Sequence, residues 1–182
     1  MNPVMQAIRD RYSCRDFSPS PLTEEQVKTL AEAALAAPSA VNRQPWHIIV
    51  ITDKALIDEF DADAMGIIKA QNHEHYQRMA ERGGKIFYNA PCLVVIAKDG
   101  TDYATLDCGI ATQNVALAAH SMGLGNVICG MARIPFGGPR AQEWTKRLQI
   151  PDGYEFGMSV CVGTAQSGKE PHELDFAKLS YI

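Results

Sequence analysis

The chain has 182 residues, of which 46% are hydrophobic and 21% charged, and its formal net charge is −4 at pH 7. This is the composition of an ordinary soluble globular protein, and the length predicts a single domain spanning residues 1–182. The net charge gives no electrostatic reason to bind nucleic acid. No stretch approaches the roughly 18 apolar residues of a membrane span, so no membrane partner is expected.

The first residues and the cysteines favour a cytoplasmic location. Residues 1–10 lack the basic region and apolar run of a secretory signal. The five cysteines are odd in number and contain no C-x-x-C pair, which favours reduced core thiols over a disulfide framework or a zinc site. They are Cys14, Cys92, Cys108, Cys129 and Cys161.

Two helices are predicted at the start of the chain. Apolar residues recur at every fourth position through residues 4–12 and indicate a short first helix. Thr23 and Gln26 form a capping-box pattern that begins a second, amphipathic helix. Pro38 ends this helix, because the residue before a proline is disfavoured in the α conformation.

Strands and helices then alternate. Strands are predicted at residues 46–52, 91–97, 126–132 and 156–163. Helices are predicted from Asp53 through Ala64, over residues 103–122 and around residues 143–148. Residues 66–89 have the weakest periodicity and are expected to be partly helical and exposed. This order predicts a sheet between helices in a three-layer α/β/α sandwich.

The stretch RYSCRDF places Arg11, Ser13 and Arg15 close together. Guanidiniums bind phosphate oxygens bidentately and a hydroxyl adds a further hydrogen bond, so the triplet suits a phosphate. By itself, such a triplet is more often a solvated basic patch than a binding site. Cys14 lies between the arginines, and nearby cations can lower the pKa of a thiol.

The stretch APSAVNRQPW, residues 37–46, joins the second helix to the first strand. Ser39, Asn42 and Gln44 can hydrogen-bond a planar heterocycle from a loop that two prolines stiffen. Taken alone, Ser39 or Asn42 would more simply be explained as satisfying backbone groups in a helix-to-strand connection.

Together the two stretches resemble the nitroreductase family of FMN-dependent oxidoreductases. The family pattern Arg-x-Ser-x-Arg/Lys-x-Phe is matched by Arg11, Ser13, Arg15 and Phe17. Its second pattern is matched by Ala37, Pro38, Ser39, Asn42, Gln44, Pro45 and Trp46. The likeness covers most of the chain and fades between residues 61 and 86.

The resemblance implies an α+β fold with a mixed central sheet, and a homodimer with FMN at the interface. The phosphate would be bound by the segment Arg11, Tyr12, Ser13 and Arg15, with Lys169 as an additional cation. Pro38, Ser39, Asn42 and Gln44 would reach the flavin from the opposite subunit. Backbone amides of Cys129, Gly130 and Met131 would face the N5 and O4 edge.

Other motifs carry less weight. His73 and His75 are spaced i, i+2 and do not share a helix face, so no metal site is predicted. The GLG at 123–125 follows a helix instead of opening one, and RGGK at 82–85 lacks the Walker spacing. No catalytic side chain is predicted, because the flavin performs the chemistry.

The expected function is NAD(P)H-dependent reduction of nitroaromatic, quinone or similar acceptors by a ping-pong mechanism. One alternative is a flavin-binding or regulatory protein of the same fold with little turnover. Another is a specialised flavoenzyme of the dehalogenase or flavin-destructase type.

Overall fold

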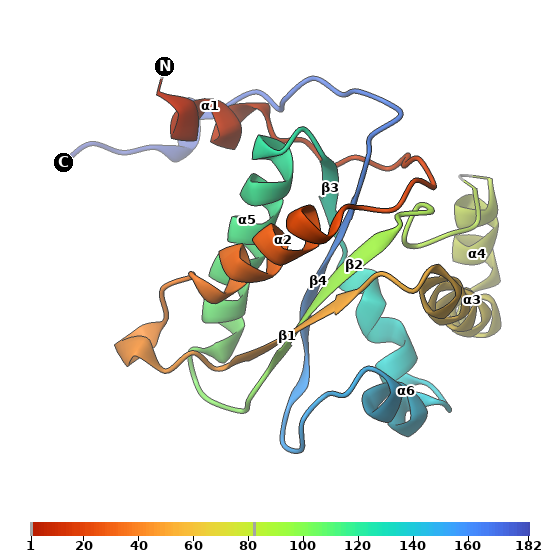
Figure 1. The fold of residues 1–182 in the computed structure, drawn as a ribbon. Helices are drawn as coiled ribbons and strands as arrows, with labels where there is room; N and C mark the ends of the chain where they lie inside the picture. The colour runs from red at the N-terminus through yellow and green to blue at the C-terminus, as the bar shows by residue number, and fades with distance from the viewer. Residues whose placement is uncertain (1, 82) are drawn as a thin grey trace.

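The computed structural model describes residues 2–81 and 83–182, and a four-stranded sheet forms its centre (Figure 1). The strands are β1 (Trp46–Ile51), β2 (Cys92–Lys98), β3 (Gly125–Ile128) and β4 (Glu155–Gly163), in the order β1-β2-β4-β3. All three ladders are antiparallel. The fold is therefore α+β.

The prediction of a mixed sheet is wrong for these four strands. Ile51 at the end of β1 pairs with Leu93 at the start of β2, so the chain enters β2 at the same end of the sheet at which it left β1. The connection, which contains α3 and α4, returns the chain to the end of the sheet where β1 finished, whereas a parallel pair needs a crossover to the opposite end. The only parallel pairing among the described residues is the isolated bridge between Ser13 and Asn126.

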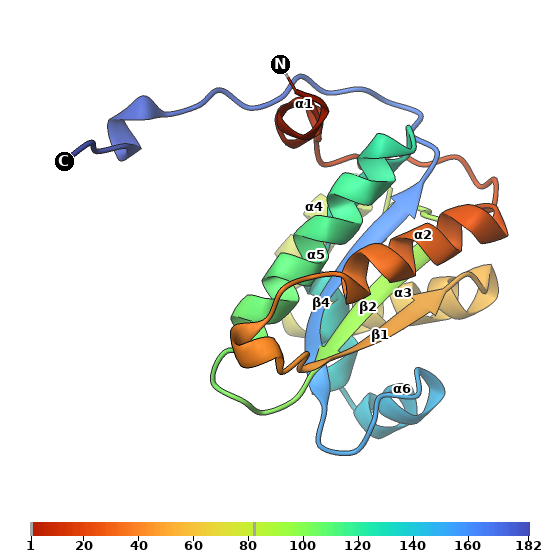
Figure 2. The same cartoon turned by 60° about the vertical axis from the view of Figure 1, so that its left-hand side comes forward.

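Helices cover both faces of the sheet (Figures 1 and 2). The face that carries Val94 and Ile96 packs on α2 and α5, and the face that carries Leu93 and Val95 packs on α3, α6 and a 3-10 segment. This alternation follows from the two-residue period of a strand. The helices are α1 (Pro3–Asp10), α2 (Glu24–Leu35), α3 (Lys54–Gln71), α4 (His73–Ala80), α5 (Ala104–Ser121) and α6 (Ala141–Arg147), with 3-10 turns η1 (Ala40–Asn42), η2 (Gly130–Gly137) and η3 (Phe176–Lys178).

Local signals placed the first helices correctly. The Thr23 hydroxyl accepts from the Gln26 N–H at 3.2 Å, and the Thr23 N–H donates to the Gln26 side chain at 2.9 Å. This reciprocal pair satisfies two donors that the first turn of α2 leaves free. Asp53 caps α3 with its carboxylate, which accepts the N–H groups of Ala55 and Leu56.

The region from 66 to 89 is partly helical, as predicted, but part of it is buried and not exposed; residue 82 lies outside the described residues. Residues 66–71 continue α3, and Ile86 and Phe87 are fully buried instead of exposed. The Asp61 carboxyl accepts both of their N–H groups, at 2.9 and 3.2 Å. The Asp61 carboxyl on α3 therefore supplies the acceptor that the backbone N–H groups of Ile86 and Phe87 need when they are buried.

The third strand is shorter than predicted. It ends at Ile128, and its last backbone contact to β4 is the Cys129 N–H bonded to the Ser159 carbonyl at 2.8 Å. The chain then turns into η2, which packs against α3. Apolar content alone cannot distinguish this buried 3-10 segment from a continued strand.

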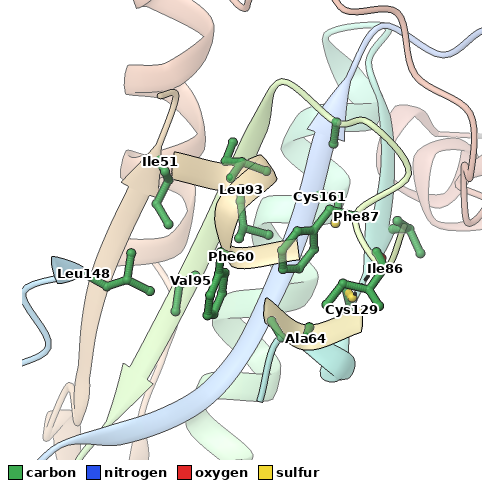
Figure 3. Packing of buried hydrophobic residues seen from close by; sticks show 14 of the residues in the cluster. Ile51, Phe60, Ala64, Ile86, Phe87, Leu93, Val95, Cys129, Leu148 and Cys161 are labelled. Atoms are coloured by element: carbon green, nitrogen blue, oxygen red, sulfur yellow. Dashed lines mark hydrogen bonds between the residues drawn. The ribbon is translucent and has the colours of Figure 1, made fainter. Parts of the chain in front are cut away.

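The core on the α3 side contains packed aromatic rings among aliphatic side chains (Figure 3). Phe60 stacks on Phe87 with ring centroids 5.6 Å apart and meets Trp144 at 4.7 Å. All five cysteines are buried free thiols, as expected. None of the helices in the described part of the chain has both the length and the apolarity to cross a bilayer.

Candidate functional site

The arginine segment is bound to the end of the sheet. Ser13 forms a bridge with Asn126 at the start of β3, and the Cys14 N–H donates to the Asn126 carbonyl at 2.9 Å. Phe17 bridges to Ala165 just after β4. Backbone bonds of 2.9 Å join Asp16 to Gln166 and Ser18 to Thr164. Tertiary hydrogen bonds therefore hold residues 13–18 beside the ends of two strands.

Two glycines make this close approach possible. A Cβ on Gly125 would lie 2.9 Å from the Ala165 Cβ and 3.0 Å from the Cys14 Cβ. A Cβ on Gly163 would lie 3.1 Å from the Phe17 ring and 2.6 Å from Pro91. All four distances are shorter than an ordinary carbon–carbon contact, so glycine is required at both positions for steric reasons.

The segment presents cations without acidic partners. Arg11 and Ser13 are half-buried and Arg15 is exposed. Within residues 2–81 and 83–182, neither guanidinium forms an ion pair, and the Lys169 ammonium forms none either. These three cations are therefore available to an anionic ligand.

Tyr12 connects the segment to the chain that carries Lys169. Its hydroxyl donates to the Ser167 carbonyl at 2.8 Å, across 155 residues of sequence. Burial, and then the neighbouring Cys14, raise the pKa of Tyr12, so it remains a neutral donor. Lys169 follows two residues after the bonded carbonyl, so the structure brings the arginine segment and the chain that leads to Lys169 to one end of the sheet.

Cys14 is not an activated thiol. It is 1% exposed and donates to the Asp16 carbonyl at 3.2 Å. Burial is the largest influence on the pKa of Cys14 and raises it above its ordinary value. The thiol fills space between the arginine segment and the strands.

Cys129, Gly130 and Met131 lie at the opposite end of β3. Asn126, which pairs with Ser13, is four residues before Gly130, and at the rise of a strand this separates the two ends by about 13 Å. Cys129 is buried and donates to the Ile86 carbonyl at 3.5 Å (Figure 3). The Cys161 thiol contributes most to lowering the pKa of Cys129, and burial raises that of Cys161.

Gly130 and Met131 line an open cleft of about 970 Å³. Its walls come from α3, α4, η2 and the first half of β4. A Cβ on Gly130 would have one neighbour within 4 Å, the Met158 sulfur at 3.9 Å, so the Gly130 backbone is open to a ligand. Arg133 and the stacked rings of Phe136 and Phe156 also line the cleft.

The predicted loop is preorganised by its own side chains. Ser39 accepts the Gln44 N–H at 2.9 Å, and the Gln44 amide donates to the Asn42 carbonyl oxygen at 3.1 Å. Val41, Asn42 and Gln44 have φ of 48°, 57° and 51°. Positive φ is costly for a β-branched residue, about 1–3 kcal/mol, so tertiary contacts must stabilise the loop.

Within one chain the loop lies away from the arginine segment. Pro38, Asn42 and Gln44 are exposed beyond the C-terminal end of α2, whereas residues 11–22 lead to its N-terminal end (Figures 1 and 2). The 12 residues of α2 span about 18 Å. The structure therefore brings the arginine segment to the chain that leads to Lys169 but does not bring the loop to the arginine segment.

Three features of the site were missed in the sequence. Gly125 and Gly163 permit the docking of the arginine segment, and Arg133 lines the cleft. A glycine at each end of a strand is a weak signal, because glycine also occurs at turns for conformational reasons. The cleft depends on η2, which periodicity did not predict.

Comparisons with known proteins agree with this geometry. The profile of the Nitroreductase family matches residues 8–164. A crystal structure of a nitroreductase with bound FMN from Desulfitobacterium hafniense DCB-2 superposes with a TM-score of 0.95 at 44% identity, covering 100% of this chain and 99% of that one.

Two relatives extend the comparison. A protein of Methanothermobacter thermautotrophicus described as an NADH dehydrogenase/NAD(P)H nitroreductase is 30% identical over 70% of this chain, which spans 61% of that relative's length. The FMN reductase (NADPH) of Bacillus subtilis is 29% identical over 94% of this chain and 70% of its own. Since the family profile covers most of the chain, from the arginine segment to the end of the sheet, the chain belongs to the nitroreductase family.

Proposed function

We propose that this chain, an FMN-dependent NAD(P)H oxidoreductase of the nitroreductase family, reduces nitroaromatic, quinone or similar small acceptors as a homodimer. The observation that carries the proposal is the arrangement along β3. The segment that carries Arg11, Ser13 and Arg15 lies at one end of this edge strand, and an open glycine backbone in a large cleft lies at the other. All 182 residues would act as one flavin-binding unit.

The phosphate end fits FMN by its donor set. Arg11, Arg15 and Lys169 supply charge, and Ser13 supplies a hydroxyl next to a strand end. A dianionic phosphate matches two guanidiniums and an ammonium that have no acidic partner among the described residues. Tyr12 would keep the two chain segments at a constant separation through its bond to Ser167.

The ring end fits FMN by its open backbone. A side chain at Gly130 would project into the cleft, so glycine there leaves room for a flat ring against the main chain. The Cys129 thiol is buried behind this backbone. Polar backbone groups at the flavin edge would stabilise the charge of the reduced cofactor without a catalytic side chain.

A second copy of the chain would complete the site. The separation of the loop from the arginine segment supports this, because Pro38, Ser39, Asn42 and Gln44 cannot serve a flavin bound to their own subunit's phosphate segment. Large apolar side chains are exposed in the loop and at the start of α5: Val41 is 96% exposed, Tyr103 61% and Leu106 62%. An apolar patch of this kind suits a protein interface.

When bound, FMN supplies hydride transfer from a nicotinamide to a second acceptor at the same ring face, which makes the kinetics ping-pong. The protein binds the phosphate and positions the ring. The Phe136 and Phe156 rings would offer apolar surface to a planar acceptor.

The direct test is to purify the protein, record its visible spectrum and add NADH or NADPH without oxygen. We expect a flavin spectrum that either nicotinamide bleaches and a nitroaromatic or quinone restores. FMN retention without bleaching would identify a binding or regulatory protein instead. Failure to bind FMN after reconstitution would refute the proposal.

The phosphate assignment is tested with Arg15→Ala. Loss of a charge-assisted bond costs roughly 1.5–3 kcal/mol, so FMN affinity should fall by about 10- to 150-fold. Arg9→Ala is the matched control, since Arg9 is an exposed arginine in the last turn of α1. Equal FMN affinity in both variants would remove Arg15 from the site.

The shared site is tested with mixed dimers of Arg15→Ala and Asn42→Ala subunits carrying different tags. If the loop acts on the partner, one site of each mixed dimer combines both defects and the other is intact. We expect half of the sites in the purified mixed dimer to bind FMN with wild-type affinity. If the loop acts within its own chain, every site has one defect and none recovers.

A further inference from the structure

Asp107 is an acidic residue buried in an apolar part of the molecule. It lies in the first turn of α5 and is 3% exposed. Its two carboxyl oxygens accept the Ala40 N–H, at 3.2 and 3.3 Å, across 67 residues of sequence. In the part of the chain that the structure describes, no other group donates to this carboxyl.

Ala40 is the first residue of η1, in the middle of the loop that would bind the flavin. Val41 and Asn42, which have positive φ, follow it directly, and Gln44, also with positive φ, comes two residues after Asn42. At the far end of the loop, the Pro45 carbonyl accepts the Asp99 N–H at 2.9 Å. In the segment in between, the Arg43 guanidinium lies 3.9 Å from the Asp99 carboxylate and Val41 is 96% exposed, so few contacts keep it in a strained conformation.

We infer that Asp107 is a positioning residue for flavin binding: its carboxyl holds Ala40, and through it the Ser39–Gln44 loop, in the conformation that contacts the partner subunit's FMN. The inference rests on the proposed function of the loop. Burial of Asp107 makes the contact specific, because a buried carboxyl without its N–H partner and a buried N–H without its acceptor are both costly. The internal bonds of Ser39, Asn42 and Gln44 shape the loop, and Asp107 places it on α5.

This placement connects two parts of the proposed interface. Leu106, the neighbour of Asp107 on α5, and Tyr103, one turn earlier, are exposed, while Asp107 itself points to the loop. The loop position is therefore set by the helix that would pack against the second copy. Substitution of Asp107 should therefore weaken FMN binding at the site that contains the partner's arginine segment. The site that contains the arginine segment of the substituted subunit should be unchanged.

The test compares FMN affinity of Asp107→Ala, Asp107→Asn and Asp102→Ala homodimers. Asp107→Ala removes the acceptor, and the dissociation constant for FMN should rise by roughly 5- to 150-fold. Asp107→Asn keeps one acceptor oxygen and should recover most of the affinity. Asp102→Ala is the matched control at the same end of α5, since Asp102 is exposed and has no hydrogen bond to the loop among those described, and it should bind FMN like the wild type.

A mixed dimer separates positioning from a general loss of structure. We expect Asp107→Ala paired with Arg15→Ala to regain one site of wild-type affinity, because the Arg15→Ala subunit supplies an intact loop to the intact arginine segment of its partner. A variant that merely unfolds its own subunit would recover none. Hydrogen exchange of the Ala40 amide in the unsubstituted apoprotein gives a reading that needs no substitution: protection is expected, and rapid exchange would contradict the bond.

The outcomes distinguish this inference from the function on which it rests. If Asn42→Ala weakens FMN binding while Asp107→Ala does not, the loop binds flavin and the role of Asp107 is refuted. If neither variant changes FMN affinity, the proposed function of the loop fails together with the inference. If Asp107→Ala weakens binding only at the site of its own arginine segment, positioning across the interface is refuted.

Discussion

Gly125→Ala tests whether close packing of the arginine segment is required for the site. The new Cβ would lie 2.9 Å from the Ala165 Cβ and 3.0 Å from both the Cβ and the sulfur of Cys14. Carbon atoms pack best at about 3.5–4.0 Å, so each neighbour would have to move by about 0.5–1 Å. Neither Cβ can rotate away, because a Cβ is attached directly to the main chain. The main chain of residues 13–16 or 164–166 must therefore shift.

Overpacking of this kind costs about 1–3 kcal/mol of the free energy of unfolding. Movement of the same segment displaces Arg15 and Ser13, so FMN affinity should fall as well. The assays are urea unfolding of the apoprotein and titration with FMN followed by quenching of flavin fluorescence. The second assay detects a displaced segment even where the first shows only a small loss.

Gly66→Ala is the matched control. Gly66 is exposed within α3, and a Cβ there would meet nothing within 4 Å. Alanine in a helix interior is favoured over glycine by about 0.5–1 kcal/mol, so this variant should be slightly more stable with unchanged FMN affinity. If Gly125→Ala unfolds at the wild-type urea concentration and binds FMN normally, the steric argument is refuted.

Two further predictions concern the α3 side of the core. Arg147 and then Arg140 lower the pKa of Glu59 from 4.5 to about 2, so the stabilisation from this carboxylate is complete above pH 4.5 and is lost as the pH falls toward 2. The difference in unfolding free energy between wild type and Glu59→Gln should therefore shrink on acidification, and a constant difference would contradict it. Asp61→Ala leaves two buried N–H groups without an acceptor and should cost about 2–6 kcal/mol in chemical denaturation, whereas Asp61→Asn should cost less. Equal losses in the two variants would show that these hydrogen bonds do not stabilise the core.

The elements that local sequence predicted well are those whose signals are local. The capping box of α2 needs only residues three apart, and β2 is a continuous apolar run between turn residues. The end of β3 and the burial of Ile86 were predicted wrongly for a common reason. Each depends on a partner distant in sequence, η2 packing on α3 in one case and Asp61 in the other.

The candidate site divides in the same way. Residue chemistry and the spacing of two motifs, read through a family resemblance, indicated a phosphate segment, a polar loop and a flavin. Sequence alone could not show that Tyr12 bonds to Ser167, which brings the chain two residues before Lys169 to the arginine segment. It also gave no indication that Asp107 supports the loop, because an acid on an apolar helix has many possible partners.

By itself, the sequence determined the helices and strands that local periodicity and caps encode, and the type of ligand that its clustered arginines suit. Only the tertiary structure decided that the four strands are antiparallel and that Gly125 and Gly163 admit the arginine segment. It also decided that the loop and the arginine segment lie toward opposite ends of α2. The physical reason is that these features depend on contacts between residues far apart in the chain. Such contacts are selected by the packing of the whole core, and short-range preferences do not specify them.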